Sequence, residues 1–214
     1  MQGLRPIHLP PARERVASEL RKAIISQKLQ EGEIITLEGV AELLQVSSMP
    51  VREAFQILAR DGLIELRHNK GAVVLGVTEC YIREHYELRR ILESAAAAGA
   101  SRPEADIGAV ESICLVAGEA VERGDFSHYA DYNQSFHYEI WKASGNGKIT
   151  RLLSELWNGL SMGSVVTVDQ YAVVSQKEHG AILSAIKAHD GKLAGEYMEH
   201  HINRSMNDML THYQ

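Results

Sequence analysis

Three histidines and one asparagine have the types and the spacing that a metal site requires. Asn133 and His137, in the segment NQSFH, are four residues apart and share one face of a helix. His179 and His201 recur in register with apolar residues, which places them on the inner faces of two further helices. Three imidazoles and an amide oxygen could bind one divalent cation and leave positions open for a small ligand. Each histidine alone is more often a hydrogen-bonded core residue, so spacing by itself leaves both interpretations open.

A buried charge is expected in the segment YELRRILE, where Arg89 precedes Glu93 by four residues. An arginine on the inward face of a helix is costly unless its charge is compensated. Two arrangements would compensate it: an ion pair with Glu93 one helical turn later, or an anionic ligand bound between the helices.

A helical bundle is needed to bring these residues together, and the sequence after Thr78 predicts one. Apolar residues recur there at three- and four-residue steps, interrupted by Pro103, by Gly124-Asp125 and by a turn at 144–147. The predicted helices span residues 78–100, 104–122, 126–143, 147–162, 175–189 and 191–211. Six helices with short connections favour an antiparallel bundle.

The preceding segment predicts a helix-turn-helix. Residues 37–44 (LEGVAELL) and the stretch from 46 (VSSMPVREAFQ) predict two helices separated by a tight turn. Ser47 and Ser48 suit the N-cap of the second helix, whose inner face is apolar. Arg52 lies on the opposite face, which would enter a DNA major groove.

A β-wing follows this second helix, which Asp61-Gly62 closes. Residues 63–75 (LIELRHNKGAVVL) predict two strands around a turn, with Arg67 and His68 beside the tip. Lys70-Gly71 at the tip could approach a minor groove closely, because glycine has no side chain. A plain hairpin tip is the alternative. A further helix is predicted at residues 12–26.

The formal net charge of −6 divides unevenly along the chain. Residues 1–77 hold 10 Lys and Arg against 9 Asp and Glu, whereas residues 78–214 hold 12 against 19. A nearly neutral segment cannot bind DNA by bulk electrostatics. Binding must therefore rest on a few placed cations and on two copies acting together, which predicts a homodimer.

Cysteine content and hydropathy indicate a cytoplasmic protein. Cys80 and Cys114 are 34 residues apart and form no Cys-x-x-Cys pattern, which favours two reduced thiols. No signal-peptide apolar region follows Met1, and the longest apolar stretches are too short to span a bilayer. We expect no association with a membrane.

Residues 12–77 resemble the winged helix-turn-helix of the GntR superfamily of bacterial transcription regulators. The resemblance rests on SSMPVREAF followed by LARDGLIELRHNKGAVV; the PVREA core is intact, and Ser48 stands where the family has arginine. It implies binding to double-stranded operator DNA. The residues that it implicates are Ser47, Ser48, Met49, Arg52, Arg67, His68, Lys70 and Gly71.

Residues 78–212 resemble the FCD effector domain of the FadR group within this superfamily. Its metal-binding members carry Asp-x-x-x-His, then Glu-His, then a histidine 22 residues later. The matching residues here are Asn133, His137, His179 and His201, with asparagine in place of aspartate. The resemblance implies a divalent metal ion, zinc in the first place and nickel or another transition metal in the second. Since YELRRILE resembles the family's YEVRxxLE, it also implies that Arg89 and Glu93 bind a small carboxylate effector.

The sequence thus predicts a mainly α protein with two domains. Residues 1–77 form a winged helix-turn-helix, and residues 78–214 form an FCD-like antiparallel bundle for effector binding and dimerisation. We expect a transcription regulator rather than an enzyme. A metal-independent regulator is one alternative, and a His-ligated metalloenzyme is another. The second is disfavoured because no His-x-Glu or His-Glu-x-x-His motif supplies a general base beside the histidines.

Overall fold

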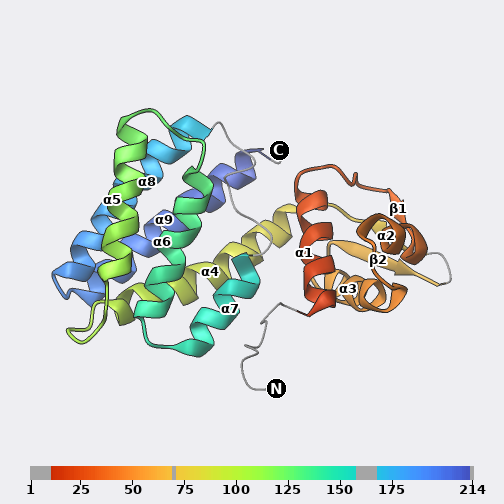
Figure 1. Ribbon diagram of the computed structural model, residues 1–214, viewed down its shortest axis with the longest axis horizontal. Coiled ribbons are helices and arrows are strands. Elements are labelled where there is room, and N and C mark those ends of the chain that lie inside the picture. Colours follow the sequence, from red (N-terminus) through yellow and green to blue (C-terminus); the bar gives the residue numbers. More distant parts are fainter. Residues whose placement is uncertain (1–10, 69–70, 158–167, 213–214) are drawn as a thin grey trace, which may run out of the picture. The chain divides into compact units, whose positions relative to one another are not determined.

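The computed structural model of this chain describes residues 11–68, 71–157 and 168–212 (Figure 1). The chain divides into two compact units, Met1–Val77 and Thr78–Gln214. Helices dominate both units, and the strands form one small sheet in the first. The predicted mainly α fold class is confirmed.

The N-terminal unit is a winged helix-turn-helix. Its elements are α1 (Ala12–Ile25), β1 (Ile34–Ile35), α2 (Leu37–Leu44), α3 (Ser48–Arg60), β2 (Ile64–Arg67) and β3 (Gly71–Val74). The strands pair antiparallel in the order β1-β3-β2. Phe55 and Leu58 of α3 are buried where α3 packs against α1. Thr36 caps α2 by accepting a hydrogen bond from the Gly39 amide at 3.1 Å.

Two details of this unit differ from the sequence prediction. Ser47 occupies the N-cap position of α3, but its side chain makes no capping hydrogen bond. Strand β1 was not predicted, because two residues are too short to produce an alternating pattern.

Gly71 has a structural role that the sequence analysis did not predict. It begins strand β3 with φ +82°, and a Cβ built on it would lie 2.1 Å from the carbonyl oxygen of Ile35. A side chain at this position would therefore collide with strand β1. The close approach that requires glycine in this structure is one between strands β1 and β3, and the predicted approach of Gly71 to DNA stays a prediction.

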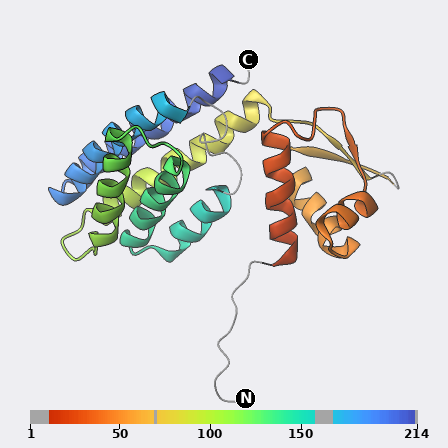
Figure 2. The ribbon, with the colours of Figure 1, turned by 45° about the horizontal axis from the view of Figure 1, so that its top comes forward.

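The C-terminal unit is a helical bundle. Its helices are α4 (Glu79–Ala100), α5 (Gly108–Glu122), α6 (Tyr129–Ala143), α7 (Gly147–Trp157), α8 (Val168–Lys187) and α9 (Gly191–His212). The two longest, α4 and α9, run alongside each other in opposite directions (Figures 1 and 2). Helix α8 packs on α9, and α6 packs on both α4 and α5. Large side chains such as Tyr86, Phe136 and Trp141 fill the interior.

Three predicted helix starts were wrong. Helix α5 begins at Gly108 rather than at residue 104. At this start, the Asp106 carboxylate accepts a hydrogen bond from the Gly108 amide. Helix α6 begins at Tyr129 rather than 126, because Asp125 binds the amide and hydroxyl of Ser127 in a turn. Helix α8 begins at Val168 rather than 175. The predicted end of α7, at 162, lies outside the described residues.

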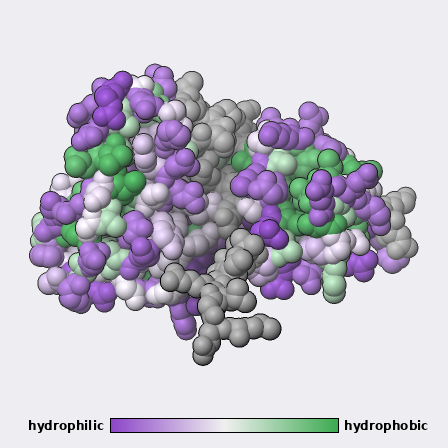
Figure 3. All heavy atoms as spheres, in the orientation of Figure 1, coloured by the Kyte–Doolittle hydropathy of each residue, from purple (hydrophilic) through white to green (hydrophobic). Residues whose placement is uncertain are grey.

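The face of the bundle shown in Figure 3 is mostly polar. In Figure 3, hydrophilic residues cover much of the face in view, and hydrophobic residues gather over α5. Leu115 and Val116 of α5 are among the exposed apolar side chains. Within the described ranges, none of the helices combines the length and the hydropathy that a membrane span needs.

The role of Gly71 can be tested against Gly62, which also has a positive φ but has open space around its Cβ position. Gly62→Ala should lower the free energy of unfolding by roughly 1–2 kcal/mol, from backbone strain alone. Gly71→Ala should lower it by at least about 3 kcal/mol, because strain and collision add. Urea unfolding followed by circular dichroism should show the difference. The fluorescence of Trp141 and Trp157, both in the bundle, should report an unchanged transition. Equal losses in the two variants would refute this role for Gly71.

Candidate metal centre and nucleic-acid interface

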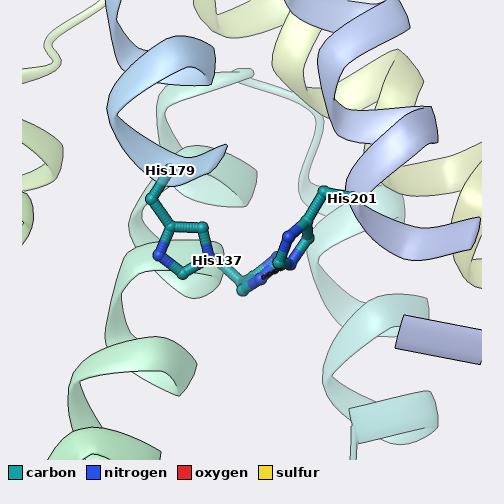
Figure 4. A group of neighbouring side chains, drawn as sticks. All are labelled: His137, His179 and His201. Atoms are coloured by element: carbon teal, nitrogen blue, oxygen red, sulfur yellow. Dashed lines mark hydrogen bonds between the residues drawn. The ribbon is translucent and has the colours of Figure 1, made fainter. Parts of the chain in front are cut away.

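Three predicted histidines meet inside the bundle. His137 comes from α6, His179 from α8 and His201 from α9, and all three are at most 1% exposed. One ring nitrogen of each lies within 4.8 Å of the others. Figure 4 shows the three rings directed toward one another from their separate helices. The inner-face positions that apolar periodicity predicted for His179 and His201 are therefore right, and His137 also points into the bundle as its spacing from Asn133 allowed.

Two carboxylates fix the orientation of two of these rings. His137 Nδ1 lies 2.5 Å from Glu93 Oε2, and His201 Nδ1 lies 2.6 Å from Glu178 Oε2. Burial raises the pKa of Glu93, but the charge of Arg89 and the contact with His137 outweigh it and lower this pKa to about 2. Burial is likewise outweighed at Glu178, where hydrogen bonds from His201 and Arg204 lower the pKa to about 2. Both carboxylates are thus ionised and can only accept, so each ring donates from Nδ1.

The opposite ring nitrogens then face each other. His137 Nε2 lies 3.2 Å from His201 Nε2. Burial lowers the pKa of His201 to about 4, against the opposing effect of Glu178, so its ring is neutral and its Nε2 carries a lone pair. Two lone pairs at this distance repel each other unless a proton or a cation lies between them. Two nitrogens bound tetrahedrally to one zinc ion lie roughly 3.4 Å apart.

His179 distinguishes a shared proton from a metal cation between the two Nε2 atoms. Its Nε2 is buried and has no hydrogen-bond partner among the residues that the structure describes. Burial, followed by the neighbouring His201, holds the pKa of His179 well below its ordinary value, so this ring is neutral as well. A proton shared by His137 and His201 would leave the third nitrogen unsatisfied. A divalent transition metal would satisfy all three, and neutral imidazoles are ligands that such metals prefer.

Asn133 lies one helical turn before His137 on the same buried face of α6. Its side-chain oxygen is buried and has no hydrogen-bond partner in the described part of the chain. An amide oxygen is a weaker, uncharged donor than a carboxylate. Of the four predicted metal residues, the three histidines thus form the cluster, and Asn133 offers an unused oxygen on the adjacent turn.

Arg89 adopts the first of its two predicted arrangements. Its guanidinium binds Glu93 Oε1 through Nε at 2.8 Å and Nη2 at 2.7 Å, and both side chains are at most 4% exposed. The guanidinium also lies over the ring of Trp157, 4.5 Å from its centre. The other oxygen of Glu93 contacts His137, and it accepts a bond from Trp141 Nε1 at 3.3 Å. One carboxylate therefore connects the buried cation to the histidine cluster.

Sequence reasoning did not assign Glu178 to the site. Glu178 faces away from its neighbour His179 on α8 and reaches His201 on α9. Arg204 binds both of its oxygens through Nε at 2.9 Å, and binds Asp208 at 2.5 Å. Carboxylates that orient ligating imidazoles are frequent around metals. The adjacent pair Glu178-His179 was the available sequence signal for such a partner.

Four of the predicted DNA-binding residues line one cleft of the N-terminal unit. Ser47, Ser48, Met49 and Arg52 of the α3 start are exposed, as are Arg67 and His68 of the wing. Arg52, Arg67, His68 and Gly71 line a cleft of about 540 Å³ between α3, the start of α2 and β2. Met49 is 71% exposed, and a large apolar side chain at such a position can contact a thymine methyl group. Lys70 lies outside the described residues.

Two family models match the chain. Residues 12–74 match the model for bacterial regulatory proteins of the gntR family, and residues 84–204, more than half of the chain, match the model for the FCD domain. The chain belongs to the gntR family. It is a DNA-binding transcriptional regulator of the GntR type with an FCD domain, as the sequence resemblance predicted.

Two relatives and one solved structure are similar to this chain over most of its length. The gluconate operon transcriptional repressor of Bacillus licheniformis is 29% identical over 192 residues, which cover 84% of this chain and 77% of that protein. The repressor RspR of Escherichia coli (strain K12) is 23% identical over 196 residues, 90% of this chain and 86% of that protein. The structure of E. coli McbR/YncC has the same fold, with a TM-score of 0.72, 19% identity and coverage of 96% of this chain and 100% of that chain.

If Glu178 orients His201 as a metal ligand, its substitution should reduce metal affinity in this gntR-family protein without abolishing it. Glu178→Gln would replace the ionised acceptor of His201 with a neutral amide and should weaken zinc binding by about 10–100-fold. Glu196→Gln, which alters an exposed glutamate near Lys192 on α9, is the matched control and should change nothing. Calorimetric titration with zinc measures both variants. An unchanged affinity in Glu178→Gln would show that this carboxylate does not support a metal ligand.

Proposed function

We propose that this regulator binds one divalent metal ion through His137, His179 and His201, with Asn133 as a fourth ligand. The observation that carries the proposal is the 3.2 Å separation of two Nε2 atoms whose rings each contact a carboxylate through Nδ1. Zinc is our first choice, because it prefers neutral imidazoles in tetrahedral sites, and nickel or another transition metal is the second. A bound metal would supply a positive charge with open positions for a carboxylate.

We further propose that the effector is a small organic acid held between this centre and Arg89. Arg89 is a buried cation connected to His137 through Glu93. An arriving carboxylate could share the guanidinium with Glu93, because arginine has five N–H donors. The name of the B. licheniformis relative refers to an operon for gluconate, which is itself an organic acid.

A binding role is favoured over catalysis. A general base for hydrolysis needs a pKa near the working pH. The two carboxylates at the cluster, Glu93 and Glu178, instead have pKa values of about 2, and arginines hold both. We therefore propose a regulator without enzymatic activity. A regulator whose bundle binds its effector without metal is the second candidate.

We propose that the protein acts as a cytoplasmic homodimer on two half-sites of operator DNA. The near-neutral charge of residues 1–77 supports this, because one such module has few cations to contact phosphates. The cations at the cleft, Arg52 and Arg67, are exposed, and Arg67 pairs with Glu65 at 3.0 Å. Effector binding would favour one arrangement of the dimer, with a coupling free energy of typically about 1–3 kcal/mol.

The DNA interface predicts that Arg52→Ala will weaken operator binding by roughly 1–3 kcal/mol if Arg52 contacts guanine in two places. Arg60→Ala is a suitable control, because Arg60 is exposed in the last turn of the same helix, away from the α3 start. Gel-shift titrations at fixed salt measure both affinities. Equal affinities for Arg52→Ala and the parent protein would remove Arg52 from the interface.

The metal proposal predicts that His179→Ala will abolish metal binding and the response to effector, while effector-free DNA binding stays within about twofold of the parent. His128→Ala is the control, because His128 is exposed at the start of α6 and its Nδ1 lies 3.7 Å from the exposed Asp131. Elemental analysis of freshly purified protein and gel shifts with and without effector test the two statements. The absence of a divalent ion from the parent protein, together with no metal uptake in titration, would contradict the proposal.

A further inference from the structure

An acidic side chain lies among the cations of the cleft in the N-terminal unit. Glu38 of α2 lines this cleft together with Arg52 of α3 and with Arg67 and His68 of the wing. Glu38 is exposed, and it forms no ion pair with another residue that the structure describes in this unit. A surface that contacts phosphates loses affinity when it carries an acid, because the acid repels the DNA backbone. The DNA interface proposed above does not account for Glu38.

The start of α2 holds Glu38 beside the wing. Strand β1 ends at Ile35, which pairs with Ala72 of β3. The next residue, Thr36, caps α2, because its Oγ1 accepts a hydrogen bond from the Gly39 amide at 3.1 Å. Glu38 is the second residue of the helix that follows. The backbone that carries Glu38 is therefore anchored to the sheet on one side and to a capped helical turn on the other.

The chemistry of a carboxylate selects one base in a DNA major groove. An ionised carboxylate accepts hydrogen bonds and donates none, so it needs a donor on the base edge. Guanine presents two acceptors there, and thymine presents one acceptor and a methyl group. Adenine presents a donor, N6, beside an acceptor, N7, that would repel a carboxylate. Cytosine presents the donor N4 without an acceptor of its own, and it is the base that glutamate recognises best.

We infer that Glu38 determines operator specificity by accepting a hydrogen bond from the N4 amino group of a cytosine. This cytosine would lie in the same half-site as the guanine that Arg52 contacts. The inference rests on the proposed function, because it takes from it that the cleft faces the bases of operator DNA. It adds a residue that the sequence analysis did not assign to the interface, and it names the base that this residue recognises.

Arg52 and Glu38 would recognise complementary features of one half-site. Arginine donates to the acceptors of guanine, whereas glutamate accepts from the donor of cytosine. The two side chains come from different helices and line one cleft, so they can contact different bases at the same time. Repulsion between Glu38 and phosphates weakens binding to every sequence. The hydrogen bond to cytosine compensates for this repulsion only at the correct site, which increases discrimination between sequences.

Selection of binding sites from a random pool of double-stranded DNA tests this role with the full-length protein. The parent protein should enrich a motif that contains a cytosine, and Glu38→Ala should lose the preference at that position alone. Glu42→Ala is the matched control. Glu42 is exposed one turn later on α2 and is not among the described residues that line the cleft, so its replacement removes the same charge and should retain the motif. Melting curves show that both variants are folded.

The selection separates this inference from operator binding itself. An unchanged motif in Glu38→Ala would overturn the inference and leave operator binding in place. Loss of the cytosine preference in Glu42→Ala as well would also overturn it, because the effect would then come from charge alone. A parent protein that enriches no motif would contradict both the inference and the proposed operator binding.

A modified base tests the hydrogen bond directly. N4-methylcytosine still pairs with guanine, but a methyl group replaces the N4 hydrogen that faces the major groove. In gel shifts at fixed salt, the parent protein should bind a site with this base about 10–100-fold more weakly than the unmodified site. Glu38→Ala should bind the two sites equally, and it should bind DNA of unrelated sequence more tightly than the parent does. Equal weakening of the parent and of Glu38→Ala by the methyl group would overturn the assignment.

Discussion

Two carboxylate–imidazole contacts determine the chemistry of the bundle interior. Glu93 accepts from His137, Glu178 accepts from His201, and each contact turns the remaining nitrogen of its ring toward the other. The neutral ring of His179 adds a third nitrogen to the same small volume. Without a cation this arrangement leaves ring nitrogens unpaired and a cation would pair them, which is why we propose that the centre binds a metal.

The same contacts connect the helices. Glu93 joins α4 to α6, and Glu178 joins α8 to α9, so the cluster lies where two pairs of helices meet. Buried and partly buried charges of this kind contribute little net stability, because desolvation offsets most of their attraction. Each is paired here, Glu93 with Arg89 and Glu178 with Arg204. A change of ligand at the cluster would therefore alter contacts among four helices. An effector domain needs such a connection between its ligand and its helix packing.

Local patterns in the sequence predicted much of the fold and several residues of the site. The PVREA segment and the tight turn before it predicted the helix-turn-helix. Apolar periodicity placed His179 and His201 on inner faces, and the four-residue spacing from Asn133 placed His137 on the same face as that residue. The pairing of Arg89 with Glu93 was one of two predicted arrangements, since both lie on one helix. Such patterns could not predict contacts between helices, because periodicity within one helix carries no information about its neighbour. The contact of Glu178 on α8 with His201 on α9 is an example. The early start of α8 and the requirement for Gly71 beside β1 depend equally on tertiary packing.

Nitrogen-15 NMR of the histidine rings tests the central claim most directly, because it distinguishes the two tautomers and reports coordination of each nitrogen. In metal-free protein at neutral pH, the account predicts that His201 carries its proton on Nδ1 and that its Nε2 is bare. Addition of zinc should then shift one ring nitrogen of each of His137, His179 and His201, and should spare the exposed His128 and His200. A spectrum in which His201 is protonated on Nε2, and in which zinc shifts none of the three, would contradict the account.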